Sequence, residues 1–239
     1  MSETPLELWA NSAEAWMKRV GSGDFARDFV LDAPMLRLLG DLNGKQALDV
    51  GCGEGRFSRA MKQHGASVTG IEPTEALLRR ASELDGESEY ILGKGEDLPF
   101  PDASFDVAVF YLVLLDIPDY RQAVREAARV LKSGGRIVVA DMQSFITASP
   151  EWRWDESDAT VNLKISNYFG ERGEVVEWAD IRVVNFHRPL SLTLDAFIDA
   201  GLKLTVFEEP RPERAPEEHP SAKIGQVCPW FYIAEWLKV

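Results

Sequence analysis

Predicted strands and helices alternate along residues 45–141, and this alternation constrains the fold more than any other feature of the sequence. Apolar runs predict strands that end near Asp49 and lie within 66–73, 88–93, 105–113 and 136–141. Apolar residues at helical spacing predict helices within 55–65, 74–84 and 120–131. Because helices that join parallel strands form right-handed crossovers, we predict an α/β fold. It is a Rossmann-like, doubly wound, mostly parallel seven-stranded sheet with helices on both faces and an inserted lid region.

The rest of the chain is expected to surround this core. We predict a helical cap over the cofactor, a cofactor-binding core, an inserted acceptor or lid region, and a C-terminal helix with strands that complete the sheet, at 1–44, 45–141, 142–190 and 191–239. The insertion contains clustered tryptophans and a predicted hairpin over 173–187. The last two strands are predicted at 202–209 and 227–239, and a loop rich in proline and glutamate separates them.

The charge balance of the chain narrows the possible partners. There are 26 Lys and Arg residues against 39 Asp and Glu residues, a net charge of −13, which counts against nucleic acid as a partner. No apolar run approaches the roughly 20 residues of a membrane helix, and the N-terminus lacks the apolar core of a signal peptide. We therefore expect a cytoplasmic protein that does not contact a membrane. The two cysteines, Cys52 and Cys228, do not form a disulfide framework.

A glycine-rich turn follows the first predicted strand in "ALDVGCGEGRF". Glycines at 51, 53 and 55 let backbone N–H groups and a helix N-terminus approach a ligand closely. The dinucleotide fingerprint needs its third glycine at position 56, where this chain has Arg56, and no Gly-Lys-Ser/Thr follows for a P-loop. Neither phosphate-binding motif fits the turn.

A carboxylate ends the second predicted strand, in "VTGIEP". Glu72 at this position can accept hydrogen bonds from both hydroxyls of a ribose, and it would repel a 2′-phosphate. The sequence thus indicates a ligand with a ribose diol and no pyrophosphate. An adenosine joined to a group other than phosphate meets both conditions.

Four segments in this order resemble one family: "ALDVGCGEGRFSRAM", "VTGIEP", "GEDLPFPDASFDVAV" and "VLKSGGRIVVAD". They are similar to the class I S-adenosylmethionine-dependent methyltransferases, in the broad group of ubiquinone-biosynthesis and other small-molecule methyltransferases. The resemblance is dense over residues 45–141 and looser through the final strand. It implies S-adenosyl-L-methionine as cofactor, S-adenosyl-L-homocysteine as product, a small-molecule methyl acceptor and no metal.

The resemblance also implies roles for individual residues. The methionine moiety would lie against the glycine turn, the ribose on Glu72, the adenine beside Pro73, and the cofactor carboxylate near Arg27 in an N-terminal segment that closes over it. Lys94 stands where the family usually has an Asp that pairs with the adenine amino group, so a neighbouring group must replace that contact. The implied cofactor site comprises Gly51, Cys52, Gly53, Glu72, Pro73, Gly95, Glu96, Asp97, Tyr111 and Arg27.

The methyl group on a sulfonium is already activated, so the main task is to align a nucleophile in line and exclude water. A general base is optional. Members of the family often carry His after the fourth strand, whereas this chain has Leu115 and Asp116. His187 is the candidate base, although a hydrogen-bonded histidine at a strand end would explain it equally well.

We predict methyl transfer to an O, N or C atom of a small, apolar or aromatic molecule by in-line displacement. Four aromatic residues of the insertion are expected to line the acceptor pocket or to form a small core, namely Trp152, Trp154, Tyr168 and Trp178. The alternatives are a methyltransferase of tRNA or protein, or a non-catalytic cofactor-binding partner subunit. An NAD-dependent oxidoreductase is disfavoured by Arg56. The sequence leaves the oligomeric state and the acceptor open.

Overall fold

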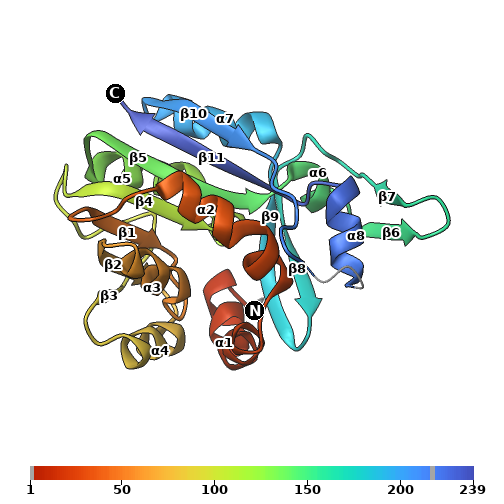
Figure 1. Cartoon of the computed structure of the whole chain (residues 1–239), viewed down its shortest axis with the longest axis horizontal. Helices are drawn as coiled ribbons and strands as arrows, with labels where there is room; N and C mark the ends of the chain where they lie inside the picture. Colours follow the sequence, from red (N-terminus) through yellow and green to blue (C-terminus); the bar gives the residue numbers. More distant parts are fainter. Residues whose placement is uncertain (1–2, 216–218) are drawn as a thin grey trace.

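A seven-stranded sheet forms the centre of the molecule in the computed structural model, which describes residues 3–215 and 219–239 (Figure 1). The strand order is β10, β11, β5, β4, β1, β2, β3. In the same order, their bounds are Leu202–Glu208, Phe231–Lys238, Leu131–Met142, Phe105–Tyr111, Gln46–Val50, Ser67–Glu72 and Glu89–Leu92. Within this sheet only β11 runs antiparallel to its neighbours, β5 and β10. The predicted α/β fold with a mostly parallel seven-stranded sheet is confirmed.

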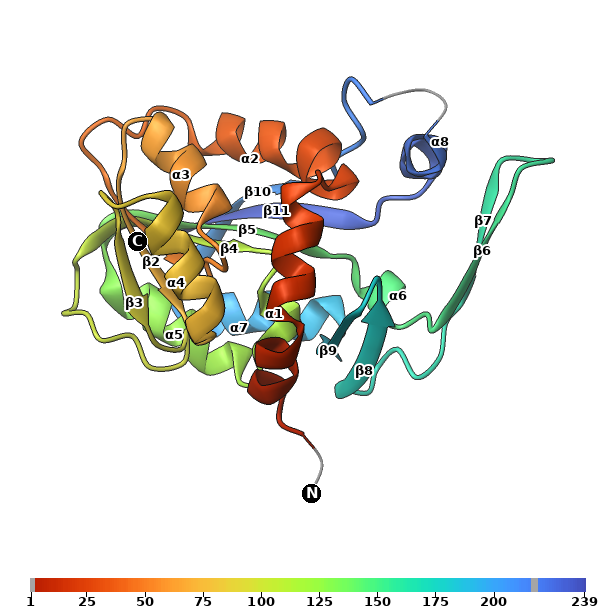
Figure 2. The same cartoon turned by 90° about the horizontal axis from the view of Figure 1, so that it is seen from below.

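Helices cover both faces of the sheet because alternate strand residues point to opposite sides. Figure 2 shows α2 and α3 on one side of the sheet, and α5 and α7 on the other. Their bounds are Asp32–Leu39, Arg56–Gln63, Tyr120–Val130 and Leu190–Asp199. In β1, Leu48 and Val50 join the buried cluster that contains α5 and α7 residues, whereas Ala47 joins the cluster of α2 and α3. The remaining covering helix, α4 (Glu75–Leu84), packs against β2 and β3.

The N-terminal segment docks on the insertion. Helix α1 (Pro5–Gly21) begins at a capping box in which Thr4 and Glu7 satisfy each other's backbone N–H groups. It contacts both α4 and strand β9 (Ile181–His187), and Ser12 exchanges 2.9 Å hydrogen bonds with the backbone of Arg182 in β9. A short π-helical turn, η1 (Arg27–Leu31), then leads into α2. Helix α1 thus connects the insertion with the half of the sheet that contains β2 and β3.

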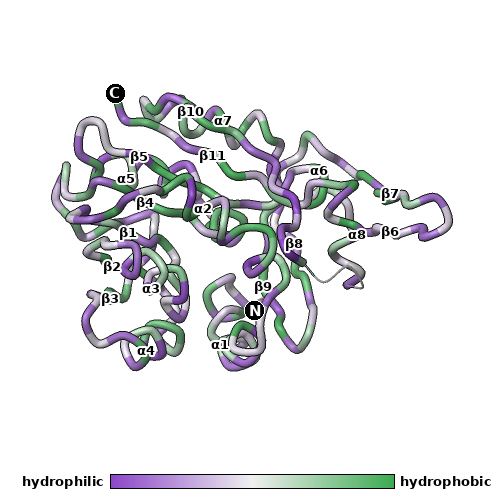
Figure 3. The backbone as a smooth tube through the Cα atoms, viewed as in Figure 1, coloured by the Kyte–Doolittle hydropathy of each residue, from purple (hydrophilic) through white to green (hydrophobic). Residues whose placement is uncertain are grey.

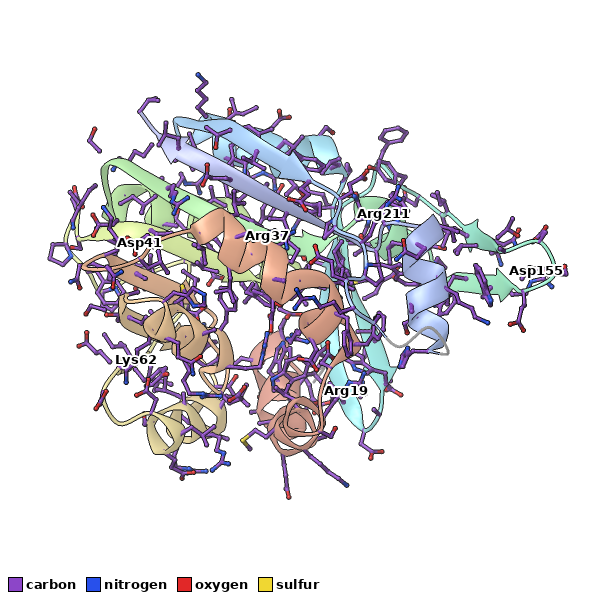
Figure 4. All side chains as sticks on the ribbon, in the orientation of Figure 1. Arg19, Arg37, Asp41, Lys62, Asp155 and Arg211 are labelled. Carbon is purple, nitrogen blue, oxygen red and sulfur yellow. The ribbon has the colours of Figure 1, made fainter. Side chains whose placement is uncertain are left out.

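The insertion consists of two hairpins. The predicted hairpin over 173–187 is confirmed as β8 (Arg172–Trp178) paired with β9 (Ile181–His187). A second hairpin, β6 (Glu151–Asp155) with β7 (Thr160–Lys164), follows the short helix α6 (Ser144–Thr147), and sequence analysis missed it. Figure 4 shows Asp155 at the outer end of this hairpin, far from the sheet, so its charged tip projects into solvent.

Two predicted boundaries are wrong. Strand β5 begins at Leu131, directly after α5, and continues through the Ser-Gly-Gly segment that was expected to precede it. The last strand begins at Phe231 and not at residue 227, because Pro220 starts an additional helix, α8 (Pro220–Val227). The predicted loop over 208–220 includes residues 216–218, which lie outside the described part of the chain.

The hydropathy pattern agrees with this architecture. In Figure 3 hydrophobic stretches run along the central strands, while hydrophilic residues gather in the outer loops. In the part of the chain that the structure describes, no helix combines the length and apolarity that crossing a bilayer requires.

Replacing Trp236 by Ala tests the contribution of β11 to the core. Trp236 is 1% exposed and stacks on Phe197 of α7 with a centroid distance of 4.7 Å. The cavity left behind should lower the free energy of unfolding by about 3–5 kcal/mol in urea titrations followed by circular dichroism. Val239→Ala, at a residue that is 79% exposed, is the control and should change it by less than about 0.5 kcal/mol. Equal stability of the two variants would contradict the assigned packing.

Candidate functional site

A cavity of about 770 Å³ opens at the point where the strand order reverses. Strand β1 continues to β2 on one side and adjoins β4 on the other, so the carboxyl ends of β1 and β4 border the crevice in which such sheets bind ligands. The cavity is lined by the turn after β1, the end of β2, the loop around Gly95, helix α1 and the insertion. Its volume suits a small organic ligand.

The turn after β1 is fastened to β2. The backbone N–H groups of Gly51 and Cys52 donate to the carbonyl of Ile71 at 2.8 and 3.1 Å. Gly51 has φ +67°, and a Cβ there would lie 2.2 Å from a methyl group of Val113. A Cβ on Gly53 would meet no atom nearer than 3.9 Å. The fold therefore requires the glycine at 51, whereas the bare backbone at 53 faces the open cavity.

Glu72 holds the same turn from the other side. Its two carboxylate oxygens accept hydrogen bonds from the backbone N–H groups of Gly53, at 3.1 Å, and Thr74, at 2.9 Å. The side chain is buried yet borders the cavity beside Pro73, and burial raises the pKa of its carboxyl. Glu72 therefore sets the shape of the glycine turn, in addition to any contact that it makes with a ligand.

A second buried acid lies beneath the turn. Asp49, the penultimate residue of β1, borders the cavity and accepts a 2.5 Å hydrogen bond from the Ser58 hydroxyl of α3. Burial raises the pKa of Asp49 to about 6. Its position near the end of a buried strand was visible in the sequence, but its partner in α3 was not.

The loop after β3 brings part of its predicted set to the cavity. Gly95 and Glu96 line it, and a Cβ on Gly95 would come within 2.9 Å of Val50. Asp97 does not line it: this residue is exposed, and its N–H donates to the carbonyl of Lys94 at 3.2 Å. Of the three residues predicted in this loop, the structure thus brings two to the cavity.

Arg56 links the glycine turn to the N-terminal segment. Its guanidinium forms two hydrogen bonds with Asp32 of α2, at 2.5 and 2.8 Å, and the Tyr111 hydroxyl donates to the same carboxylate at 2.6 Å. Tyr111 lines the cavity from the end of β4. The residue that breaks the dinucleotide fingerprint therefore anchors α2.

Arg27 reaches the cavity from η1. Its guanidinium lies 4.7 Å from the ring centroid of Trp16 and 3.3 Å from a carboxylate oxygen of Asp24. Trp9 and Trp16 of α1 also line the cavity, so the N-terminal segment borders the same space as the turn. A cation lies beside the turn, where it can attract an anionic group.

The structure does not bring His187 to the cavity. Its side chain is 2% exposed, Nε2 donates to the Tyr168 carbonyl at 2.8 Å, and Nδ1 lies 2.8 Å from the Thr147 hydroxyl. Burial lowers the pKa of the imidazole, which favours the neutral ring in this arrangement. The candidate general base is therefore corrected to a buried histidine whose two ring nitrogens are engaged at the base of the insertion.

Asp116 is a residue of the cavity that sequence analysis passed over. It follows β4 in the short 3₁₀ turn η2 (Leu114–Asp116), and its carboxylate accepts a 2.7 Å hydrogen bond from the Asn185 amide of β9. Both side chains line the cavity. Burial, together with the charge of Asp141, raises the pKa of Asp116 well above its usual range. The sequence did contain a signal for this residue, because Asp116 lies where members of the family often carry a histidine.

The aromatic residues of the insertion divide into two groups. Trp152 and Trp178 line the cavity, as do Trp9 and Trp16 of α1, whereas Trp154 and Tyr168 do not. The cavity therefore presents several large flat surfaces to a ligand. Among residues 3–215 and 219–239, no group of three or more His, Cys, Asp or Glu side chains could hold a metal ion.

Comparison with known proteins identifies the core. Residues 48–139 match the family described as Methyltransferase domain. A demethylmenaquinone methyltransferase of Tropheryma whipplei is 37% identical over 107 residues, which cover 44% of this chain and 45% of that protein. A malonyl-[acyl-carrier protein] O-methyltransferase of Serratia marcescens is 32% identical over 155 residues, 63% of this chain and 60% of that protein. The matches thus span about half the length of these relatives.

The fold comparison covers more of the chain. The crystal structure of an S-adenosylmethionine-dependent methyltransferase from Mesorhizobium loti superimposes with a TM-score of 0.78 at 26% identity, over 90% of this chain and 99% of that one. The matched sequence segment contains the glycine turn, Glu72 and the end of β4, all of which border the cavity. Residues 48–139 therefore match a methyltransferase domain, and the chain has the fold of S-adenosylmethionine-dependent methyltransferases.

Proposed function

We propose that this chain binds S-adenosyl-L-methionine in the cavity and transfers its methyl group to a small molecule. The observation that carries the proposal is the pairing of a bare glycine turn with a buried carboxylate at the switch point of the sheet. Glu72 can accept ribose hydroxyls with the lone pairs that its two backbone donors leave free. The cavity, at about 770 Å³, has room for a cofactor and a small acceptor together.

The residues around the turn take specific roles in this proposal. The methionine end lies along Gly51, Cys52 and Gly53, where the absence of side chains admits it. Pro73 and the backbone of Gly95 flank the adenine. Glu96 accepts the hydrogen bond of the adenine amino group, because Lys94 stands where the family usually has an Asp for this contact. These residues border one continuous cavity, which supports the assignment.

Arg27 and Tyr111 complete the cofactor site. Arg27 is the cation for the cofactor carboxylate, and Trp16 and Asp24 hold its guanidinium at the cavity wall. Tyr111 is fixed by its hydrogen bond to Asp32 and presents its ring to the cavity. Asp97 has no part in the site, because it is exposed and does not line the cavity.

The bound cofactor supplies a methyl group that is already activated on a sulfonium. The chain's contribution is to align the acceptor in line with the sulfur–methyl bond and to exclude water. Helix α1 and the hairpin β8–β9 cover the cavity and contribute Trp16 and Trp178 to its wall. The relatives named above are a demethylmenaquinone methyltransferase and a malonyl-[acyl-carrier protein] O-methyltransferase, and for this chain we propose a small-molecule acceptor.

Glu72→Ala should weaken S-adenosylhomocysteine binding by about 1–3 kcal/mol in calorimetric titrations, because the charge-assisted hydrogen bonds to the ribose are lost. Glu75→Ala is the matched control, since Glu75 is exposed and lies just beyond the cavity in α4. Circular dichroism should show both variants folded. Unchanged affinity in Glu72→Ala would show that this carboxylate serves the turn alone.

Gly53→Ala tests the close approach of the ligand to the turn. A methyl group there meets open space in the protein, so the variant should fold, yet it should weaken S-adenosylhomocysteine binding about tenfold through overpacking against the ligand. Gly44→Ala carries a similar positive φ, +70° against +58°, in open space away from the cavity, and should leave the affinity unchanged. If both variants bind like the wild type, no ligand lies against Gly53.

A further inference from the structure

The cavity contains a carboxylate to which the proposed cofactor site assigns no role. Asp116 follows β4, on the β5 side of the turn that holds the proposed cofactor, and its Oδ1 accepts from the Asn185 amide at 2.7 Å. No hydrogen bond or ion pair engages its other oxygen within the described residues. Asp116 thus offers a free acceptor site to whatever shares the cavity with the cofactor.

The loop that carries Asp116 is held rigidly. Arg188 is 7% exposed and donates hydrogen bonds to the backbone carbonyls of Leu114, at 2.6 Å, and of Ile117. Asn185 lies in β9, three residues before Arg188. The insertion therefore fixes the position of the loop backbone and of the Asp116 side chain. A catalytic group must be held in this way to react in one geometry.

Several charged groups surround this carboxylate. Asp141 of β5 and Glu72 of β2 disfavour its negative charge, and Arg27 of η1 favours it, while burial is the largest influence. Asp141 itself is buried and has a pKa raised to about 7. An acceptor that carries its own carboxylate would add a further negative charge among these acids, at a cost in affinity.

The walls of the acceptor side are flat and apolar. Trp152 and Trp178 of the insertion face the cavity that Trp9 and Trp16 border from α1. Such surfaces bind planar rings well. A partly exposed carboxylate beside these tryptophans can accept a proton from a planar molecule that carries a hydroxyl group.

We propose that Asp116, positioned by Asn185, is the general base for a neutral aromatic hydroxyl, so that the chain is an O-methyltransferase of phenol-type acceptors. This inference rests on the proposed function. The hydroxyl oxygen forms its bond to the methyl carbon, the carbon–sulfur bond breaks with its electron pair left on sulfur, and the hydroxyl proton moves to Asp116. The products are an aryl methyl ether, neutral S-adenosylhomocysteine and a protonated Asp116 that returns its proton to water.

The first test measures selectivity by calorimetry, with 2-naphthol and 2-naphthoate as probes of equal ring size. In the S-adenosylhomocysteine complex, at a pH above the raised pKa of Asp116, the wild type should bind 2-naphthol about tenfold or more tightly than 2-naphthoate, since like charges in the cavity repel. Asp116→Asn keeps the shape and the Asn185 hydrogen bond, and should reduce this preference to about threefold or less. Asp180→Asn removes one acid from the exposed β8–β9 turn and should keep the full preference.

The second test follows the formation of 2-methoxynaphthalene by mass spectrometry. Asp116→Asn should lower turnover by about 10²-fold or more while cofactor affinity stays unchanged. Because only the ionised carboxylate accepts a proton, wild-type turnover should fall as the pH drops through the raised pKa of Asp116, and this acid limb should be absent from the variant.

The outcomes separate the two proposals. If S-adenosylhomocysteine fails to bind, the proposed function is wrong, whatever the probes do. If it binds but 2-naphthoate binds as tightly as 2-naphthol, if neither probe binds, or if Asp116→Asn keeps the preference or the turnover, this inference is overturned and the proposed function stands.

Discussion

The candidate site depends on the way the turn after β1 is fastened to β2. Two consecutive N–H groups, of Gly51 and Cys52, converge on one carbonyl of Ile71, and the next N–H in the pattern, of Gly53, donates to Glu72. The turn must therefore curl toward β2 with positive φ at Gly51 and Gly53. This geometry exposes bare backbone to the cavity and places a carboxylate beside it. The two features that point to an adenosyl ligand thus arise from one set of hydrogen bonds.

The same region is tied to the rest of the molecule through charge. Arg56 and Tyr111 both bond to Asp32, so the turn, the end of β4 and α2 share one polar cluster. The chain then brings α1 back over the cavity, where Ser12 fastens it to β9. A chain segment before the sheet and an insertion between β5 and β10 consequently line the same cavity.

The sequence predicted the parts of this site that are set locally. The glycine turn and Glu72 lie at strand ends that hydrophobic patterning reveals, and the alternation of strands and helices implies the sheet. It could not reveal the partnership of Asp116 with Asn185, because these residues are 69 positions apart and meet only through the packing of β9 on η2. The prediction of His187 as the base was wrong for the same reason. Nothing near it in sequence shows that Thr147 and Tyr168 contact its two ring nitrogens. Hairpin β6–β7 was missed because most of its residues are exposed, so its strands contain no buried apolar run.

The proposed ligand of the cavity is an adenosyl sulfonium donor and not a dinucleotide. Calorimetric titration of the purified chain with S-adenosylmethionine, S-adenosylhomocysteine and NAD distinguishes the two. We expect micromolar binding of both adenosyl ligands at one site per chain and no heat from NAD, because the turn has no pyrophosphate cradle. Micromolar binding of NAD alone would contradict it.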